Sequence, residues 1–225
     1  MDVVKERIGE VAASLVQDGM LIGLGTGSTA NCFIQALAKR YHDEGIVIAT
    51  VSSSYSSEKL ARESGLPFVT IDAISEIDIT FDGADEIDSQ KRMIKGRGGA
   101  LLKEKILASH SKELIIMVDE TKWVSALGTK AKLPVEIIQF GYLLTAKKLL
   151  EFAHSVKLRL RADNRPFMTE SGHFIMDVEL KLPIENYEAL CDKIRDIAGV
   201  VETGFFFGMT PRVITGYADS SVKIS

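Results

Sequence analysis

The sequence predicts an α/β protein in which a mainly parallel sheet, with helices on both faces, is combined with a smaller α+β domain. Helix-like and strand-like patterns alternate through roughly the first half of the chain, and the order changes to β-α-β-β-α-β in the second half. Hydrophobic residues make up 46% of the 225 residues, which is enough for a sizeable core. The first part is therefore expected to be Rossmann-like and the second ferredoxin-like.

Hydrophobic periodicity assigns each element of the first half. Helices have apolar residues at spacings of three and four, whereas strands are short, apolar and rich in β-branched residues. Helices are expected over 2–17, 28–41, 54–64 and 99–110, and strands over 20–24, 46–51, 67–71, 77–81 and 114–118. Strands that alternate with helices of this length indicate a parallel sheet.

The second half follows the same rules with a different order of elements. Strands are expected over 135–140, 156–161, 173–180 and 200–203, and helices over 142–154 and 184–197. A last apolar strand over 212–217 could return to the first sheet. The predicted domains are therefore residues 1–129 together with 205–225, and residues 130–204.

Composition excludes several classes of function. The net charge of −4 lacks the basic footprint that nucleic-acid binding requires. No apolar run approaches the roughly 18 residues of a membrane span, and the N-terminal residues lack the pattern of a signal peptide. Cys32 and Cys191 lie far apart in sequence, which favours core thiols over a disulfide or a metal site. A reducing, cytoplasmic location fits this pattern.

A glycine-rich turn over 23–29 predicts a phosphate site. Thr26, Ser28 and Thr29 supply hydroxyl groups next to Gly27, and the N–H groups that open the following helix point at the same place. A dinucleotide site is disfavoured, because the second strand does not end in the acid that would bind a ribose. A purely structural alternative is that Ser28 caps the helix, although a cap requires one hydroxyl.

An acidic cluster over 82–88 follows the strand expected at 77–81. Asp82 and Asp85 are candidates for ligand binding, because Asp82 ends an apolar strand and Gly83-Ala84 allows a tight turn. Glu86 and Asp88 are expected to be solvated loop charges. The spacing of the four acids does not match a calcium loop and no histidine is close in sequence, so no metal site is expected.

Glu104 is the candidate base. Its neighbours three and four residues away on the expected helix are all apolar, which desolvates the carboxylate and raises its pKa toward the range of a general base. The alternative is a half-exposed glutamate paired with Lys103 or Lys105. Lys95 enters the glycine-rich turn, residues 96–99, that leads into the same helix. A base, a cation and paired carboxylates suit proton transfer on a small anionic substrate.

These motifs together resemble the ribose-5-phosphate isomerases of the A type over essentially the whole chain. The matching motifs are Gly25-Thr26-Gly27-Ser28-Thr29, Ser52-Ser53-Ser54, Asp82-Gly83-Ala84-Asp85-Glu86, Lys95-Gly96, Lys103-Glu104-Lys105, Asp119 with Lys122, and Leu133-Pro134-Val135-Glu136. One departure is Arg97, where the family usually has a neutral residue.

The resemblance implies interconversion of ribose 5-phosphate and ribulose 5-phosphate by a homodimer or homotetramer, without a metal or organic cofactor, and we expect the smaller domain at the oligomer interface. It implies that Glu104 transfers the proton, that Asp82, Asp85 and Lys95 serve the reacting end, and that Lys5 and Lys122 help to bind the phosphate. The residues expected to bind substrate are Lys5, Thr26, Gly27, Ser28, Thr29, Asp82, Gly83, Ala84, Asp85, Lys95, Gly96, Arg97, Gly98 and Lys122.

Two alternatives remain at the level of sequence. Amino-sugar phosphate deaminases and CoA transferases share a similar sheet with a working carboxylate, but the stretch from Lys95 to Glu104 does not suggest either. A sugar-phosphate-sensing module, like those attached to bacterial repressors, would need a DNA-binding segment, and the sequence begins almost directly on the first expected helix.

Overall fold

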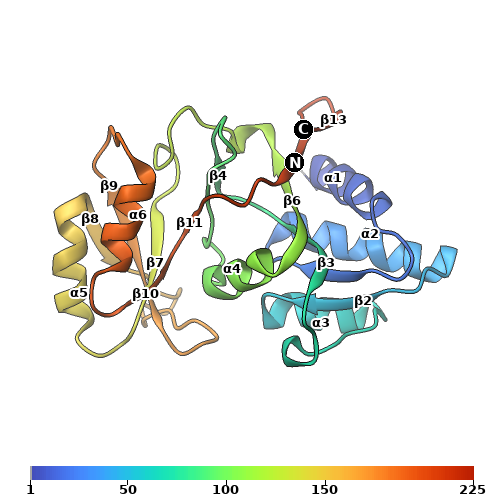
Figure 1. Cartoon of the computed structure of the whole chain (residues 1–225), viewed down its shortest axis with the longest axis horizontal. Helices are drawn as coiled ribbons and strands as arrows, with labels where there is room; N and C mark the ends of the chain where they lie inside the picture. Colours follow the sequence, from blue (N-terminus) through green and yellow to red (C-terminus); the bar gives the residue numbers. More distant parts are fainter. Residues whose placement is uncertain (1) are drawn as a thin grey trace. The chain divides into compact units, whose positions relative to one another are not determined.

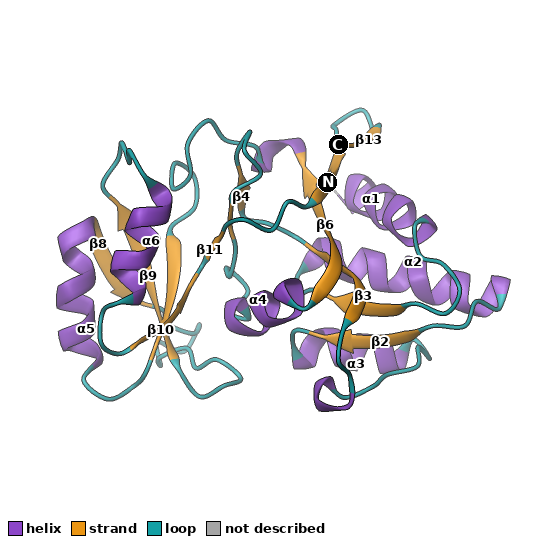
Figure 2. Cartoon of the chain, viewed as in Figure 1, coloured by secondary structure: helices purple, strands orange, loops and turns teal. Residues whose placement is uncertain are grey.

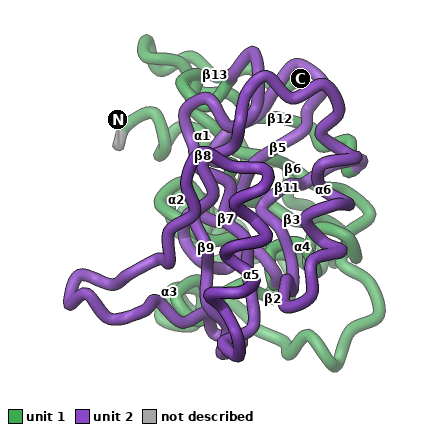
Figure 3. Tube along the Cα trace, turned by 90° about the vertical axis from the view of Figure 1, so that its left-hand side faces the viewer, with its two compact units in different colours: residues 1–84, 103–123, 209–225 green, residues 85–102, 124–208 purple. Residues whose placement is uncertain are grey.

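The computed structural model describes residues 2–225, which form two compact units (Figure 3). The first unit contains the chain up to Ala84 together with Lys103–Trp123 and Met209–Ser225, and the second contains Asp85–Leu102 and Val124–Gly208. This division differs from the expected one, since residues 85–102 belong to the second unit. The boundaries expected at 129/130 and 204/205 stay a prediction.

The first unit is built on a six-stranded sheet in the order β13-β12-β6-β3-β1-β2 (Figure 1). Its strands are Leu21–Leu24 (β1), Ala49–Ser52 (β2), Ile77–Asp82 (β3), Ser111–Asp119 (β6), Arg212–Gly216 (β12) and Val222–Ile224 (β13). All neighbouring strands are parallel except β12 and β13. Because β12 pairs with β6, the C-terminal segment returns to the first sheet, which confirms that prediction.

Helices cover both faces of this sheet. They are Asp2–Ser14 (α1), Ser28–Glu44 (α2), Tyr55–Glu63 (α3) and Leu101–Ser109 (α4). Ile8 of α1 and Phe33 of α2 are buried in one cluster with Phe81 of β3, whereas Leu107 of α4 packs in a separate cluster with Val51. No helix within residues 2–225 is long and apolar enough to cross a membrane.

The second unit contains the expected β-α-β-β-α-β order. Its elements are Leu133–Ile137 (β7), Tyr142–Leu149 (α5), Ala153–Leu158 (β8), Phe174–Leu180 (β9), Tyr187–Arg195 (α6) and Val200–Thr203 (β10) (Figure 2). The sheet order is β10-β7-β9-β8 and every neighbouring pair is antiparallel, which is the ferredoxin-like arrangement. A second, small sheet joins Phe205–Phe206 (β11), Met93–Ile94 (β5) and Glu86–Ile87 (β4).

Three differences from the predicted elements have local causes. Residues 67–71 do not form a strand, since only a single bridge joins Phe68 to Thr50 and Pro67 has no N–H to donate. Helix α6 begins at Tyr187 rather than at 184, because the Asn186 side chain caps it by accepting a hydrogen bond from the N–H of Ala189. Strands β4, β5 and β11 have two residues each, too few to produce a periodic pattern.

Candidate active site

The carboxyl ends of β1 and β3 bring Asp82 against the first glycine-rich turn. The Asp82 side chain is buried, and its Oδ1 accepts hydrogen bonds from the N–H groups of Thr26 at 3.2 Å and Gly83 at 2.7 Å. A Cβ atom at Gly25 would lie 2.1 Å from the same oxygen, so a side chain at this position would displace the carboxylate. The adjacent parallel strands β1 and β3 therefore hold Asp82 and the glycine-rich turn together.

A cluster of serines after β2 supports the same turn. The Thr26 hydroxyl is hydrogen-bonded to the hydroxyls of Ser53 and Ser54, both at 2.8 Å. The Ser57 hydroxyl donates to the carbonyl oxygen of Gly25 at 2.6 Å, and Ser54 also caps α3. Because these contacts engage the Thr26 hydroxyl, this residue shapes the turn, and its direct contact with a phosphate stays a prediction.

Ser28 does not cap α2. The N-cap is Gly27, whose φ of 120° lies in the region that favours glycine, and no side chain caps this end of the helix. The Ser28 hydroxyl instead accepts a hydrogen bond from Nζ of Lys5 at 2.9 Å. Ser28 is exposed and Thr29 is half-buried. The start of α2 thus presents two hydroxyl side chains, a lysine ammonium and the first N–H groups of a helix, which together suit an anion.

Glu104 lies on α4 and is almost completely buried. Only 3% of the residue is exposed, and the apolar side chains of Leu101 and Leu107 on the same helix are buried with it. This burial excludes the alternative of a half-exposed glutamate. Nζ of Lys103 lies 4.5 Å from the centre of the Tyr55 ring. A buried carboxylate beside apolar side chains is withdrawn from bulk water, and a carboxylate oxygen is a group that can accept a proton from carbon.

Lys122 ends the short 3-10 helix Glu120–Lys122 that follows β6, and its side chain is half-buried. Two predicted site residues of the first unit, Lys5 and Lys122, belong to segments without a chemical motif of their own. Only the resemblance to a family pointed to them.

The second unit carries the other predicted residues. Lys95 directly follows β5 and is 3% exposed, with its Nζ 5.2 Å from the centre of the Phe206 ring. Its N–H donates to the carbonyl oxygen of Gly204 at 2.9 Å. The Oδ2 atom of Asp85 accepts a hydrogen bond from the N–H of Arg97 at 2.9 Å. Asp85 and the 95–98 turn, which carries Lys95, Gly96, Arg97 and Gly98, are therefore held together.

The remaining predicted residues differ in exposure. Gly83 and Ala84 are half-buried, Gly96 is buried, and Arg97 and Gly98 are exposed. Gly96 has a φ of 105° and a Cβ atom there would lie 2.7 Å from Cβ of Leu101, so the bend after Lys95 requires glycine. The Arg97 side chain is accordingly accessible, while its backbone N–H is held by Asp85.

Glu86 and Asp88 are not solvated loop charges, and that expectation was wrong. Glu86 is completely buried, and its carboxylate accepts hydrogen bonds from the N–H groups of Gly128, Lys130 and Ala131. Asp88 is also buried and accepts hydrogen bonds from the side chain and backbone N–H of Arg92. The donors to Glu86 are more than 40 residues away in sequence, whereas Arg92 lies four residues after Asp88, and in both cases protein donors replace water around the buried carboxylate. Within residues 2–225, no group of three or more His, Cys, Asp or Glu side chains could hold a metal ion.

Comparison with known proteins places this arrangement in a family. Residues 49–220 match the family described as ribose 5-phosphate isomerase A (phosphoriboisomerase A). A ribose-5-phosphate isomerase A of Protochlamydia amoebophila is 46% identical over 95% of this chain and 91% of its own. The ribose 5-phosphate isomerase structure from Plasmodium falciparum has a TM-score of 0.95 and 35% identity over 100% of this chain and 98% of its own. A D-ribose-5-phosphate isomerase solved in complex with phospho-erythronic acid has a TM-score of 0.94 and 34% identity over 99% and 97%.

Proposed function

The chain belongs to the ribose 5-phosphate isomerase A family and is an isomerase, and on this basis we propose that it interconverts D-ribose 5-phosphate and D-ribulose 5-phosphate. The observation that carries the proposal is the buried carboxylate of Glu104 on α4. The reaction belongs to the non-oxidative part of the pentose phosphate pathway. Neither alternative class, the deaminases and CoA transferases or the sugar-phosphate-sensing modules, is favoured by these matches.

Glu104 transfers the proton between the two carbons in our proposal. Its carboxylate removes the proton from C2 of the open-chain aldose, which gives an enediol or enediolate, and returns a proton to C1 to give the ketose. Over the whole reaction one hydroxyl proton passes from O2 to O1, so no atom is gained or lost. A single carboxylate can perform both steps if it lies over both carbons.

Lys95 stabilises the negative charge that develops on the enediolate oxygen. A buried ammonium is effective in this role, because water does not screen it and it needs no reorganisation during the reaction. Asp82 and Asp85 bind sugar hydroxyls and move a proton while the furanose ring opens. The backbone of Gly83, Ala84, Gly96, Arg97 and Gly98 lines the same substrate.

The phosphate binds at the start of α2 through the hydroxyls of Ser28 and Thr29, assisted by Thr26, the backbone at Gly27, and the ammonium groups of Lys5 and Lys122. The hydrogen bond from Lys5 to Ser28 supports this assignment, because it shows a cation at the helix start. A phosphate bound away from the reacting carbons orients the sugar without taking part in the chemistry.

The assay that tests the function is formation of ribulose 5-phosphate from ribose 5-phosphate in the presence of EDTA. We expect full activity, since Lys95 takes the role that a metal would have, and no activity on free ribose. Solvent deuterium should enter the product, because the carboxylate exchanges its proton with water during the lifetime of the enediol. Loss of activity in EDTA that one metal restores would contradict the proposed mechanism, and a protein inactive under all conditions would contradict the function.

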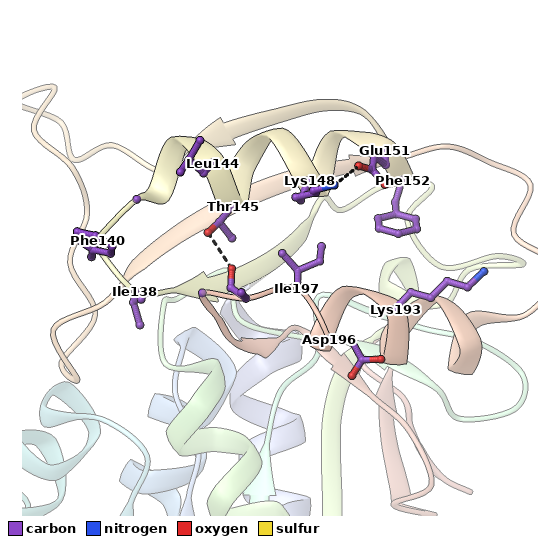
Figure 4. Close-up of a pocket in the computed structure, with 13 residues that line it drawn as sticks. Ile138, Phe140, Leu144, Thr145, Lys148, Glu151, Phe152, Lys193, Asp196 and Ile197 are labelled. Atoms are coloured by element: carbon purple, nitrogen blue, oxygen red, sulfur yellow. Dashed lines mark hydrogen bonds and ion pairs between the residues drawn. The ribbon is translucent and has the colours of Figure 1, made fainter.

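We also propose that the protein is a homo-oligomer, a homodimer or a homotetramer, that uses one end of the second unit as an interface. Around the groove of about 690 Å³ in Figure 4, Phe140 is 89% exposed and Leu144 73% exposed. Lys148, Lys193, Glu151 and Asp196 also line this groove. A second copy of the chain fits best, because a two-fold interface pairs one patch with itself, and this patch offers both signs of charge around an apolar centre.

Leu144→Asp should reduce the oligomer to a smaller species in size-exclusion chromatography with light scattering, because it introduces a charge into the apolar centre. Val47→Asp is the matched control, since Val47 is 66% exposed but belongs to the first unit. An unchanged mass for Leu144→Asp would exclude this interface.

A cytoplasmic location also remains a proposal. It is supported by the two cysteines Cys32 and Cys191, which are thiols, and cell fractionation tests it.

A further inference from the structure

We propose that Arg159 is a positioning residue for the isomerisation, because its guanidinium holds the backbone of the 95–98 turn by hydrogen bonds to two carbonyl groups. The inference rests on the proposed function, since it assigns to Arg159 an effect on catalysis rather than a contact with substrate. Arg159 follows β8 and does not belong to any of the motifs in the sequence.

The guanidinium of Arg159 binds the turn directly. Its Nη1 donates to the carbonyl oxygens of Gly96 and Arg97, both at 3.0 Å. Two donations from one nitrogen to successive carbonyl groups set the orientation of both peptide planes. These are the peptide groups between Gly96 and Arg97 and between Arg97 and Gly98, so Arg159 sets the path of the turn that follows the buried Lys95.

Two further contacts fix Arg159 itself. Its Nε donates to Oδ2 of Asp177 at 3.1 Å, and its Nη2 pairs with Oδ1 of the same carboxylate. The guanidinium carbon lies 5.9 Å from the centre of the Phe167 ring. Only 14% of the Arg159 side chain is exposed. A bidentate, largely buried pair of this kind restricts the guanidinium to a single orientation.

Phe167 supports the next residue of the same loop. The N–H of Phe167 donates to the carbonyl oxygen of Arg159 at 2.8 Å, and its ring lies against Gly99, where an added Cβ atom would be 2.4 Å from Cζ. The segment from Arg159 to Phe167 therefore contacts the loop at Gly96, Arg97 and Gly99.

The same turn also contacts a candidate active-site group, the carboxylate of Asp85. The N–H of Arg97 donates to Asp85, while the carbonyl group of Arg97 accepts from Arg159. Arg97 thus connects the Asp85 carboxylate to the Arg159 guanidinium through its own backbone. If Arg159 is removed, the peptide groups at Gly96 and Arg97 can rotate, which displaces the N–H that Asp85 accepts and the turn that follows Lys95. The phosphate-binding residues Ser28 and Thr29 belong to the other unit and make none of these contacts.

The test compares Arg159→Ala, Arg159→Lys and a matched control, Arg161→Ala, in which an exposed arginine two residues away is removed. We expect kcat for Arg159→Ala to fall by about 10- to 100-fold, with KM changed by less than about threefold, since small misplacements of reacting groups cost about this much. Arg159→Lys should lose nearly as much, because an ammonium cannot bind Asp177 and both carbonyl groups together. Arg161→Ala should match the wild type.

Chemical rescue separates positioning from general stability. Millimolar ethylguanidinium should restore part of the activity of Arg159→Ala, whereas trimethylamine N-oxide, which stabilises folded proteins, should not. If Arg159→Ala does not fold, kcat and KM are measured for Asp177→Asn instead, which keeps the shape of the side chain but weakens its bond to the Arg159 guanidinium, and kcat should fall with little change in KM. Wild-type kcat in Arg159→Ala, or full recovery with trimethylamine N-oxide alone, would overturn the inference. An inactive wild type would instead refute the proposed function.

Discussion

Nζ of Lys5 donates a hydrogen bond to the hydroxyl of Ser28 at 2.9 Å, across 23 residues of sequence. The contact joins α1 to the first residue of α2 and brings a cation to a helix N-terminus that no side chain caps. Two independent sources of positive potential, the ammonium and the helix dipole, therefore act at the same point.

Removing the hydroxyl groups at this point should weaken substrate binding. The double variant Ser28→Ala, Thr29→Ala loses two donors to a charged acceptor, each of which contributes about 1.5–3 kcal/mol. We expect KM for ribose 5-phosphate to rise well over tenfold, measured by steady-state kinetics. Ser14→Ala is the control, because Ser14 is an exposed residue of α1 whose hydroxyl donates to the carbonyl oxygen of Val11. An unchanged KM would show that the start of α2 binds something else.

Glu104→Gln tests the base. Glutamine keeps the shape and hydrogen-bonding capacity of the side chain but cannot accept the proton, so kcat should fall by about 10²–10⁴ or more. Binding of ribose 5-phosphate, followed by calorimetry, should change little, because the groups proposed to bind the phosphate are elsewhere.

Ile106→Gln is the matched control for Glu104→Gln, since Ile106 is an exposed position of the same helix. It should keep normal kcat. A folded Glu104→Gln protein with near-normal kcat would move the base to one of the aspartates.

Asp82→Asn and Asp85→Asn should each reduce kcat less than Glu104→Gln does, if these residues assist ring opening rather than deprotonation of carbon. The comparison is sharpest with a substrate that cannot form a ring, because an effect confined to ring opening then disappears. If kcat of Asp85→Asn stays below that of the wild type with the open-chain substrate, Asp85 takes part in the proton transfer between the carbons.

Asp78 gives the first unit a dependence of stability on pH. Its pKa is held below the ordinary value first by the N–H of Leu21, which donates to Oδ2 at 2.8 Å, and then by Lys112, whose Nζ donates to Oδ1 at 2.8 Å. A depressed pKa in the folded state stabilises the protein above the unfolded pKa of about 3.9, and this contribution is lost as pH falls through the folded value.

The free energy of unfolding should therefore fall less steeply below about pH 5 for Asp78→Asn than for the wild type. Urea titrations at several pH values between neutral and strongly acidic measure this difference. Lys112→Met removes the second cause, the hydrogen bond from Lys112, and keeps the first. Its free energy of unfolding should fall with decreasing pH less steeply than that of the wild type but more steeply than that of Asp78→Asn. Parallel curves for wild type and Asp78→Asn would exclude the contribution of this carboxylate.

The sequence by itself determined the order of elements and the local chemistry. Alternation of strand and helix patterns predicted the parallel sheet, the β-α-β-β-α-β order predicted the ferredoxin-like sheet, and Asp82 was predicted at the end of a strand, where β3 does end. These features depend on neighbouring residues and on strand-end geometry, so periodicity and turn chemistry are sufficient to predict them.

The tertiary structure alone decided which distant groups meet. Glu86 resembled a surface charge because its donors, the N–H groups near Gly128, are more than 40 residues away in sequence. Arg159 was missed for the same reason, since it reaches the carbonyl of Gly96 across 63 residues. A backbone amide or carbonyl group has no side-chain identity, so its pairing with a buried charge leaves no sequence pattern. Only the folded chain shows such pairs.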